Sequence, residues 1–324
     1  MHFAFCVDAN YVKYAGILMH NLLALHPEEQ LNFHLMTTGV DEEDEKRLDI
    51  FAKKFADRMN LFVYDATELL AGIPMGENAP PRLKTVVLLR IMLAECLPEN
   101  VDRVIYMDVD MLVLTPLKEL WQTDLQGKAI AAVPYMVEEK DNITPLEPYQ
   151  IELGFDHDTY FNAGLMVQDL RVWRQTDLMP RVVECYLKNS SSFKLLEQDA
   201  LNTVIGKDYV KLPARYNIQR EANHPYLQYP QDTAVLHLVN EAKQWCMGCN
   251  PLIYRLYLPY VEQSEWHGMD MQEPMTVKAG YLAAMNAELH GDEAEALKYY
   301  KRTAKALMSH YYPQFLAETE QLPS

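Results

Sequence analysis

The N-terminal part of the chain alternates short apolar runs with stretches in which apolar residues recur at helical spacing. Residues 2–7, 31–37 and 61–64 have the length and composition of buried strands. Residues 17–25 and 48–55 lie between these runs and carry apolar side chains on one helical face. The order strand, helix, strand, helix, strand predicts a mostly parallel sheet covered by helices.

The same alternation continues toward the middle of the chain, and nothing in residues 1–260 resembles a linker. We therefore expect one domain over residues 1–260. Residues 135–159 are polar, contain proline and lack periodicity, which is typical of a long loop that forms a lid or a binding wall. Further strands are expected at 129–133, 160–167 and 234–238, and helices at 83–97, which contains Arg90, and from Arg171 onward.

Residues 261–324 differ and predict a C-terminal helical extension. Apolar periodicity over 277–290 and 293–308 is interrupted at Gly291-Asp292, which indicates a helical hairpin. The hairpin resembles one tetratricopeptide unit, but a single unit cannot bury its faces as an array does.

The second helix of this hairpin carries a basic face formed by Lys298, Lys301, Arg302 and Lys305. A basic amphipathic helix with nearby aromatic residues can adsorb to an anionic membrane surface. The alternative is a solvated face opposite a packed one, and the interspersed acidic residues favour it.

Composition narrows the range of functions. The chain has 324 residues, 49% of them hydrophobic and 23% charged, as in ordinary globular proteins. Its net charge of -17 argues against a general nucleic-acid-binding protein, because phosphate affinity depends on Lys and Arg. An anionic substrate would therefore need local cations or a bound metal.

The five cysteines are scattered and odd in number, so they do not indicate a secreted disulfide framework. Cys246 and Cys249 form one CxxC pair without the further ligands of a zinc site, and we interpret them as ordinary thiols. No apolar run is long enough to span a membrane, and residues 1–7 lack the basic start of an export signal. We expect a cytoplasmic protein, with peripheral contact to the inner face of the membrane as an option.

Two carboxylates separated by one residue, Asp108 and Asp110, follow the apolar run 103–107. Alternate residues share one face of a strand, and hard cations prefer carboxylate oxygens. The spacing therefore indicates a site for a divalent cation that binds a diphosphate. For an isolated Asp-x-Asp the alternative is a solvated turn after a strand.

Six short motifs occur in order along the chain. They are Asp8-Ala-Asn-Tyr11, Arg90, Tyr106-Met-Asp-Val-Asp110, Tyr160-Phe-Asn-Ala-Gly164, Glu197-Gln-Asp199 with Asn202, and His237 followed by Lys243 and Trp245. Together they resemble glycosyltransferase family 8, the retaining nucleotide-sugar transferases that include bacterial lipopolysaccharide galactosyl- and glucosyltransferases and resemble glycogenin. The resemblance implies a GT-A fold, which is a Rossmann-like α/β fold with a mixed sheet flanked by helices.

The resemblance also implies roles for individual residues. Asp108, Asp110 and His237 would bind Mn²⁺ or Mg²⁺, since oxygen ligands and imidazole suit such ions. Gln198, Asp199 and Glu197 would form the catalytic group: Gln198 would lie near the reacting carbon, and Glu197 and Asp199 would contact hydroxyls of the donor sugar. An amide is a poor nucleophile, so we expect Gln198 to support the oxocarbenium-like centre, with nucleophilic attack as the alternative. The donor-binding residues would be Asp8, Asn10, Tyr11, Arg90, Asp108, Val109, Asn162, Ala163 and Lys243.

Most of these side chains also have an ordinary structural explanation. Asp8 or Asn10 can cap a helix, and acids at 197 and 199 are favourable at a helix N-terminus. Arg90 can form a surface ion pair, Asn162 can be a satisfied core amide, and a lone histidine is more often structural.

The chain departs from the family pattern in two places. Pro134-Tyr135 stands where galactosyltransferases of the family often carry an aspartate, which affects sugar and acceptor preference. Asn240-Glu241 replaces the usual Gly-Pro and places an acid near the expected diphosphate.

The sequence therefore predicts a metal-dependent retaining hexosyltransferase that takes glucose or galactose from a UDP-sugar. The expected acceptor is a saccharide or a lipid-linked saccharide, as in bacterial surface glycan or lipopolysaccharide synthesis. The alternatives are a glycan- or nucleotide-sugar-binding scaffold without turnover, and a haloacid-dehalogenase-like phosphatase. The position of the Asp-x-Asp after the fourth strand disfavours the phosphatase.

Overall fold

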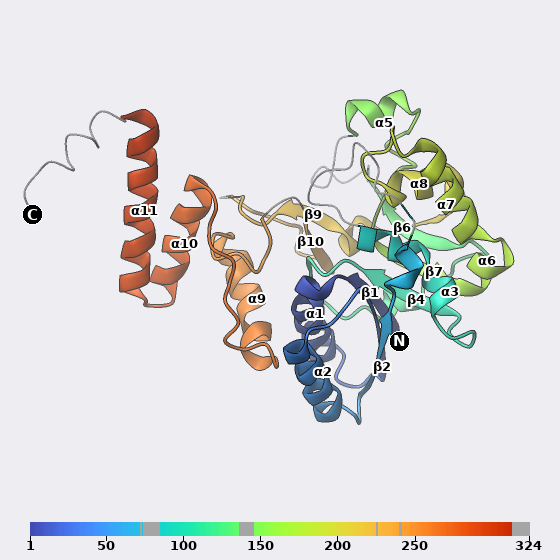
Figure 1. The fold of residues 1–324 in the computed structure, drawn as a ribbon, viewed down its shortest axis with the longest axis horizontal. Helices are drawn as coiled ribbons and strands as arrows, with labels where there is room; N and C mark the ends of the chain where they lie inside the picture. The colour runs from blue at the N-terminus through green and yellow to red at the C-terminus, as the bar shows by residue number, and fades with distance from the viewer. Residues whose placement is uncertain (72, 74–84, 136–145, 225, 240–241, 313–324) are drawn as a thin grey trace, which may run out of the picture. The chain divides into compact units, whose positions relative to one another are not determined.

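The computed structural model describes residues 1–71, 73, 85–135, 146–224, 226–239 and 242–312, which Figure 1 draws as a coloured ribbon. The chain divides into two compact units. The first comprises Met1–Gln219, Tyr229–His237 and Gln263–His267, and the second comprises Arg220–Gln228, Leu238–Glu262 and Gly268–Ser324.

A seven-stranded sheet in the order β3-β2-β1-β4-β7-β6-β8 forms the centre of the first unit. The strands from β3 to β4 run parallel, whereas β7 is antiparallel to both β4 and β6. All nine residues of β7 are buried. The predicted mixed α/β architecture is therefore confirmed. The strands are β1 (His2–Val7), β2 (Leu31–Thr37), β3 (Met59–Asp65), β4 (Arg103–Met107), β6 (Ile130–Pro134), β7 (Phe161–Asp169) and β8 (Val210–Lys211).

Two helices connect the first three strands as predicted: α1 (Val12–Leu25), which is buried over most of its length, and the amphipathic α2 (Glu42–Lys54). They lie together on one face of the sheet (Figure 1). The ring centroids of Phe33 in β2 and Phe51 in α2 lie 6.5 Å apart. Asp41 caps α2, because its side chain accepts hydrogen bonds from the backbone N–H groups of Glu43 and Asp44. The remaining helices of this unit are α3 (Leu93–Cys96), α4 (Lys118–Trp121), α5 (Pro148–Glu152), α6 (Leu170–Gln175), α7 (Leu178–Asn189) and α8 (Glu197–Ile205), with short 3₁₀ helices η1 (Ala9–Tyr11), η2 (Glu68–Leu70), η3 (Thr85–Ile91) and η4 (Ala214–Tyr216).

The prediction of one α-helix over residues 83–97 is wrong, because much of this stretch is a 3₁₀ helix. The first two residues of the stretch lie outside the described part of the chain, and the rest forms the 3₁₀ helix η3 followed by the short helix α3. The β-branched residues Val86, Val87 and Ile91 lower the α-helical propensity of this stretch. Burial of Leu88, Leu89 and Ile91 in the core then decides the local conformation.

A smaller sheet in the order β5-β10-β9 carries the last of the predicted strands. It contains β5 (Met111–Val113), β9 (Ile218–Glu221) and β10 (Val235–Val239). β10 runs antiparallel to β5, and His237 pairs with Met111. Because β5 begins directly after Asp110, this pairing brings His237 close to the end of β4.

A short segment far along the chain, Gln263–His267, belongs to the first unit. Trp266 is fully buried over Gly16 of α1, and its indole N–H donates to Asp44 of α2 at 2.6 Å. A Cβ atom on Gly16 would lie 2.1 Å from the indole ring, so only glycine fits beneath it. Glu265 adds hydrogen bonds to His20 at 2.5 Å and to Lys54 at 2.8 Å.

The second unit contains α9 (Pro251–Gln263) up to Glu262. It also contains the hairpin of α10 (Val277–Leu289) and α11 (Glu293–Tyr311), which the apolar periodicity predicts. Ala283, Ala284 and Tyr299 form its core. Among the described residues, no helix has both the length and the apolar character needed to cross a bilayer.

Candidate active site

The carboxylates of Asp108 and Asp110 lie just beyond the end of β4, in the turn that leads into β5. The Asp108 N–H donates to the Gly164 carbonyl of β7 at 2.8 Å, which fixes the start of the turn. Both side chains are partly exposed, at 23% and 18%. The acids therefore follow the strand and do not share its face, but the turn still places them together.

His237 of β10 completes this cluster. Its Nε2 lies 3.2 Å from Asp110 Oδ1 and 4.0 Å from Asp108 Oδ2, and the three possible ligand atoms lie within 4.8 Å of one another. Two carboxylate oxygens and one imidazole nitrogen suit a divalent cation such as Mn²⁺ or Mg²⁺. The donor set and its convergence thus fit a metal at the position predicted from the sequence.

The orientation of the imidazole is set by two asparagines behind it. Asn217 Nδ2 donates to Asn162 Oδ1 at 2.9 Å, so Asn217 Oδ1 is turned toward His237 Nδ1, also at 2.9 Å. Nδ1 must then carry the proton, which leaves the Nε2 lone pair facing the carboxylates. Hydrogen bonding of the remote nitrogen is the usual way in which proteins hold a metal-binding histidine.

Gly164 allows this close approach. A Cβ atom at this position would lie 2.5 Å from His237 Cε1 and 2.9 Å from Asp108 Oδ2. Any side chain here would therefore push the histidine or the carboxylate out of the cluster.

Arg90 is a buried cation directly behind Asp108. Its Nη2 lies 3.1 Å from Asp108 Oδ1 and its Nε lies 3.1 Å from Glu197 Oε1. Nη1 also donates to the Ala163 carbonyl at 3.2 Å, and the guanidinium lies over the Tyr106 ring. Burial alone would lower the pKa of Arg90, but the neighbouring carboxylates raise it, so the guanidinium stays charged.

Glu197 is the first residue of α8 and is almost completely buried. Burial raises the pKa of its carboxyl to about 7, and the Arg90 charge limits that rise. Its Oε2 atom is buried and accepts no hydrogen bond from the described residues. A buried carboxylate oxygen of this kind is suited to accept a hydrogen bond from a ligand hydroxyl.

The preceding residue, Leu196, adopts φ +49°, which is rare for a leucine. Such a backbone conformation costs on the order of 1–3 kcal/mol and persists where the surrounding structure enforces it. Leu196 immediately precedes α8, where the Glu197 side chain contacts Arg90 and the Gln198 side chain contacts Asn162.

Gln198 is held on all sides by hydrogen bonds. Its Oε1 accepts from the Ala163 N–H at 3.0 Å and from Asn162 Nδ2 at 3.3 Å. Its Nε2 donates to the hydroxyls of Tyr135 and Tyr160 at 3.1 and 3.0 Å. The structure thus brings Gln198 and Asn162 together, as the motifs suggest.

Asp199 faces the protein interior and is 0% exposed. Tyr160 and Tyr149 donate their hydroxyls to its carboxylate at 2.5 and 3.1 Å, and the N–H groups of Lys194 and Leu195 donate to Oδ2. Burial nevertheless raises the pKa of Asp199. The carboxylate anchors the start of α8 and the ring of Tyr160.

Asp8, Asn10 and Tyr11 follow β1, which runs parallel to β4, so they lie at the same edge of the sheet as Asp108. Asp8 accepts a hydrogen bond from the Asn10 N–H at 2.9 Å and caps η1. The helix-cap explanation of Asp8 is thus realised, while Asn10 and Tyr11 remain exposed side chains beside it.

Lys243 belongs to the second unit, where its Nζ donates to the Leu238 carbonyl at 2.8 Å. Its role as a donor contact stays a prediction. Val109 separates the two acids of the turn and is partly buried.

Several residues of the site were not predicted as functional from the sequence. Tyr135, Tyr160 and Asn217 contact Gln198, Asp199 or His237, and Tyr106 donates its hydroxyl to Asp108 Oδ1 at 2.5 Å. Tyr106 and Tyr160 lie within recognised motifs, which is a usable signal. No local pattern marks Asn217, because its contacts come from strands that are distant in sequence.

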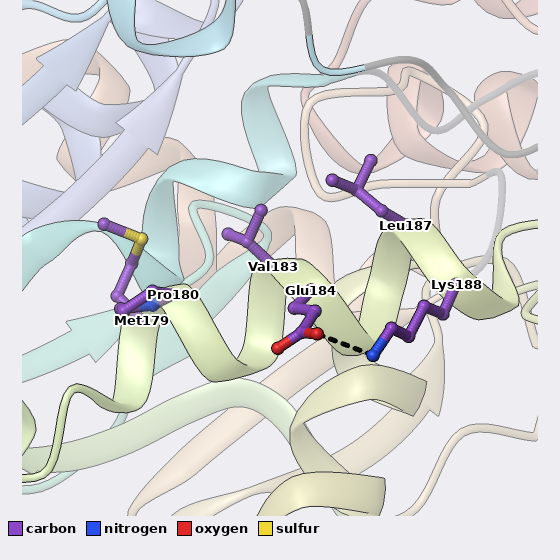
Figure 2. A pocket seen from close by; sticks show the side chains of 6 residues that line it. All are labelled: Met179, Pro180, Val183, Glu184, Leu187 and Lys188. Carbon is purple, nitrogen blue, oxygen red and sulfur yellow. Dashed lines mark hydrogen bonds and ion pairs between the residues drawn. The ribbon is translucent and has the colours of Figure 1, made fainter.

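A separate hollow lies along α7 and is shown in Figure 2. Its lining is mostly apolar and includes an ion pair between Glu184 and Lys188 at 2.6 Å. None of the side chains described above contributes to it. The lining residues are Met179, Pro180, Val183, Glu184, Leu187 and Lys188.

The mixed sheet and the acidic cluster at its edge define a GT-A glycosyltransferase. The chain belongs to glycosyltransferase family 8, since the model of the family "Glycosyl transferase family 8" matches residues 2–248. The predicted family and fold are thus confirmed.

Two curated relatives illustrate the similarity. General stress protein A of Bacillus subtilis is 24% identical over 82% of this chain and 95% of its own length. The lipopolysaccharide 1,3-galactosyltransferase of Salmonella typhimurium is 24% identical over 84% of this chain and 81% of its own length.

Among solved structures, the galactosyltransferase LgtC in complex with donor and acceptor sugar analogs has a TM-score of 0.65 at 24% identity. The alignment covers 80% of this chain and 96% of that chain. The bifunctional glycosyltransferase WbbM has a TM-score of 0.63 at 17% identity, over 82% of this chain and 50% of that one. These similarities support the same fold.

Proposed function

We propose that this glycosyltransferase moves glucose or galactose from a UDP-sugar to an acceptor hydroxyl with retention of anomeric configuration, using Mn²⁺ or Mg²⁺. The observation that carries the proposal is the convergence of Asp108, Asp110 and His237 beside the buried cation Arg90. A bound divalent cation would neutralise the charge that develops on the departing diphosphate.

The net charge of the protein also supports a site that contains a metal and a buried arginine. A net charge of -17 would repel a nucleotide sugar, and two of the carboxylates that contribute to it lie in the cluster itself. The positive charge of Arg90 offsets the charge of Asp108, and a bound metal would offset the charge of Asp110. Lys243 would add a further positive charge at the diphosphate.

The nucleotide and the sugar would bind along the edge of the sheet. Asp8 and Asn10 would hold the base and ribose by hydrogen bonds, and the exposed ring of Tyr11 would stack on the base. Val109 and Ala163 would contact the donor through their backbone, Asn162 and Glu197 would bind sugar hydroxyls, and Arg90 would approach the diphosphate.

Gln198 and Asp199 would act at or near the reacting carbon. The hydrogen bonds to both sides of the Gln198 carboxamide favour a group that is held in place and supports positive charge at the anomeric carbon. The buried Asp199 would act through its contacts with Tyr160 and the start of α8.

The acceptor would be a saccharide or lipid-linked saccharide of a bacterial surface glycan, as the names of the lipopolysaccharide galactosyl- and glucosyltransferases among its relatives suggest. Such an acceptor favours a cytoplasmic enzyme with peripheral contact to the inner face of the membrane. The outer side of α11 supports this contact, because Leu297, Leu307 and Tyr311 are exposed there beside its lysines.

The test is release of UDP by the purified protein with UDP-glucose, UDP-galactose and other UDP-sugars, each with and without Mn²⁺, with water as the acceptor of the sugar when no saccharide acceptor is added. We expect metal-dependent release with one hexose donor, which Asp110→Asn abolishes. Asp49→Asn, which changes an exposed acid on α2, serves as the matched control and should leave release unchanged.

Three results would contradict the proposal. Binding of UDP by calorimetry without release from any donor would indicate a scaffold. Metal-dependent hydrolysis of a generic aryl phosphate would indicate a phosphatase. A protein that neither releases UDP from any donor nor binds UDP would have no nucleotide-sugar site.

A further inference from the structure

The carboxamide of Gln198 uses its full hydrogen-bonding capacity within the protein. Its oxygen accepts two N–H groups, from Ala163 and Asn162, and its nitrogen donates to two tyrosine hydroxyls. An amide offers two donors and two acceptor positions, so none of the four is left over. The identity of these four neighbours therefore decides which edge of the amide is oxygen and which is nitrogen.

The two hydroxyls differ in what else they contact. Tyr160 donates its own proton to Asp199 Oδ1 at 2.5 Å, and it can only accept from Gln198. Tyr135 follows the last residue of β6, and its ring meets that of Tyr160 edge-on at 4.8 Å. Its hydroxyl accepts from Gln198 at 3.1 Å, and burial raises the pKa of Tyr135 to about 12, so it stays neutral.

We propose that Tyr135 is a positioning residue: together with Tyr160 it provides the pair of acceptors that fixes the Gln198 carboxamide in one orientation during glycosyl transfer. The inference rests on the proposed function for its effect on turnover. Without the Tyr135 hydroxyl, one N–H of the amide loses its acceptor. The carboxamide then gains freedom to rotate, and the polar support beside the reacting carbon is no longer fixed.

The chemistry of the acceptor that faces the Gln198 N–H groups matters for the charge of the site. A carboxylate at this position would also accept from the amide N–H but would add a charge to the site. A tyrosine supplies the acceptor without the charge. Beside Glu197 and Asp199, which are both buried, a neutral acceptor avoids a third buried carboxylate.

The ring of Tyr135 also packs in a small cluster with Leu146, Tyr160 and Phe155. A test must therefore separate the hydroxyl from the ring. Tyr135→Phe keeps the ring and removes only the hydrogen-bonding atom. Tyr209→Phe is a matched control, because Tyr209 is equally buried, packs against Phe161, and has a hydroxyl without a hydrogen-bond partner among the described residues.

For turnover, we expect Tyr135→Phe to lower kcat at least tenfold while the donor KM changes less than twofold. Tyr209→Phe should leave both values within a factor of two. An unchanged kcat for Tyr135→Phe, or an equal loss in both variants, would overturn the proposal.

A second measurement does not depend on turnover. In the Gln198→Glu variant, the Tyr135 hydroxyl can rotate and donate a hydrogen bond to the new carboxylate. This hydrogen bond lowers the pKa of the new carboxyl group. Adding Tyr135→Phe removes this donor, so the pKa of that carboxyl should rise by about one unit. The titration is followed by NMR with ¹³C-labelled glutamate, using wild-type protein to identify the extra signal.

Equal pKa values in the single and the double variant would overturn the positioning role even if no enzyme activity is found. Conversely, a shifted pKa in a protein that releases no UDP from any donor would uphold the contact and refute the proposed function. The two hypotheses thus fail by different results.

Discussion

A Cβ atom on Gly164 would lie 2.5 Å from Cε1 of His237, so the histidine reaches the Asp108 carboxylate only because this residue is glycine. Gly164 belongs to β7 and His237 to β10, which lie in different sheets. The cluster at the end of β4 therefore depends on how closely these two backbones approach.

Gly164→Ala should weaken Mn²⁺ binding by at least tenfold, because the added methyl group displaces His237 or Asp108. Calorimetric titration of the purified protein with Mn²⁺ measures this. Gly280→Ala is the control: its Cβ would meet only the Thr303 side chain of the helical hairpin, at 2.5 Å, and metal affinity should not change. Equal affinities in wild type and Gly164→Ala would contradict the assignment of His237 as a ligand.

Asn217→Ala should lower Mn²⁺ affinity by about 10- to 100-fold, the usual effect of removing the group that orients a ligating histidine. The Asn217 Oδ1 atom lies 2.9 Å from His237 Nδ1 and holds the proton on that nitrogen. Asn217→Asp keeps an acceptor at this place and should restore part of the affinity. If Asn217→Ala binds Mn²⁺ normally, the tautomer argument is wrong.

Glu197 predicts a pH dependence with a definite sign. With a pKa of about 7, its carboxylate is mostly ionised at pH 8 and mostly protonated at pH 6. Donor affinity that depends on the ionised form should therefore fall about tenfold from pH 8 to pH 6. UDP-sugar binding measured across this range tests it, and Glu197→Gln should bind weakly at both values without the slope.

The same carboxyl affects stability in the opposite direction. Its pKa is higher in the folded state than the usual 4.5, so the folded state binds more protons between these values. The stability that this group contributes is present below pH 4.5 and is lost as the pH rises through about 7. Urea unfolding at pH 6 and pH 8 should show this loss in the wild type and a smaller loss in Glu197→Gln.

Trp266→Ala should reduce the free energy of unfolding by about 3–5 kcal/mol, as expected when a fully buried tryptophan is removed. Its ring fills the space above Gly16, and its N–H bonds to Asp44. Trp266→Phe retains much of the ring and should cost less. Denaturant unfolding gives both values, and a loss below about 1 kcal/mol for Trp266→Ala would show that the segment is not anchored there.

Much of the fold could be predicted from local pattern. The alternation of apolar runs and helical periodicity located β1, α1, β2 and α2, because burial on one face dictates such spacing. The stretch around Arg90 was assigned the wrong helix type, since its conformation follows from packing of Leu88 and Leu89 in the core. The anchoring of Trp266 had no local signal at all.

The sequence by itself determined the family, the α/β class and the identity of the acidic pair. The order of the short motifs and the spacing of apolar residues can be recognised without any knowledge of tertiary contacts. Only the tertiary structure decided what holds each group. The pairing of β10 with β5 brings His237 to Asp110, Asn217 sets its tautomer, and Tyr135 takes a hydrogen bond from Gln198. These contacts join residues far apart in the chain, and their geometry depends on strand pairing and close packing, which no local pattern encodes.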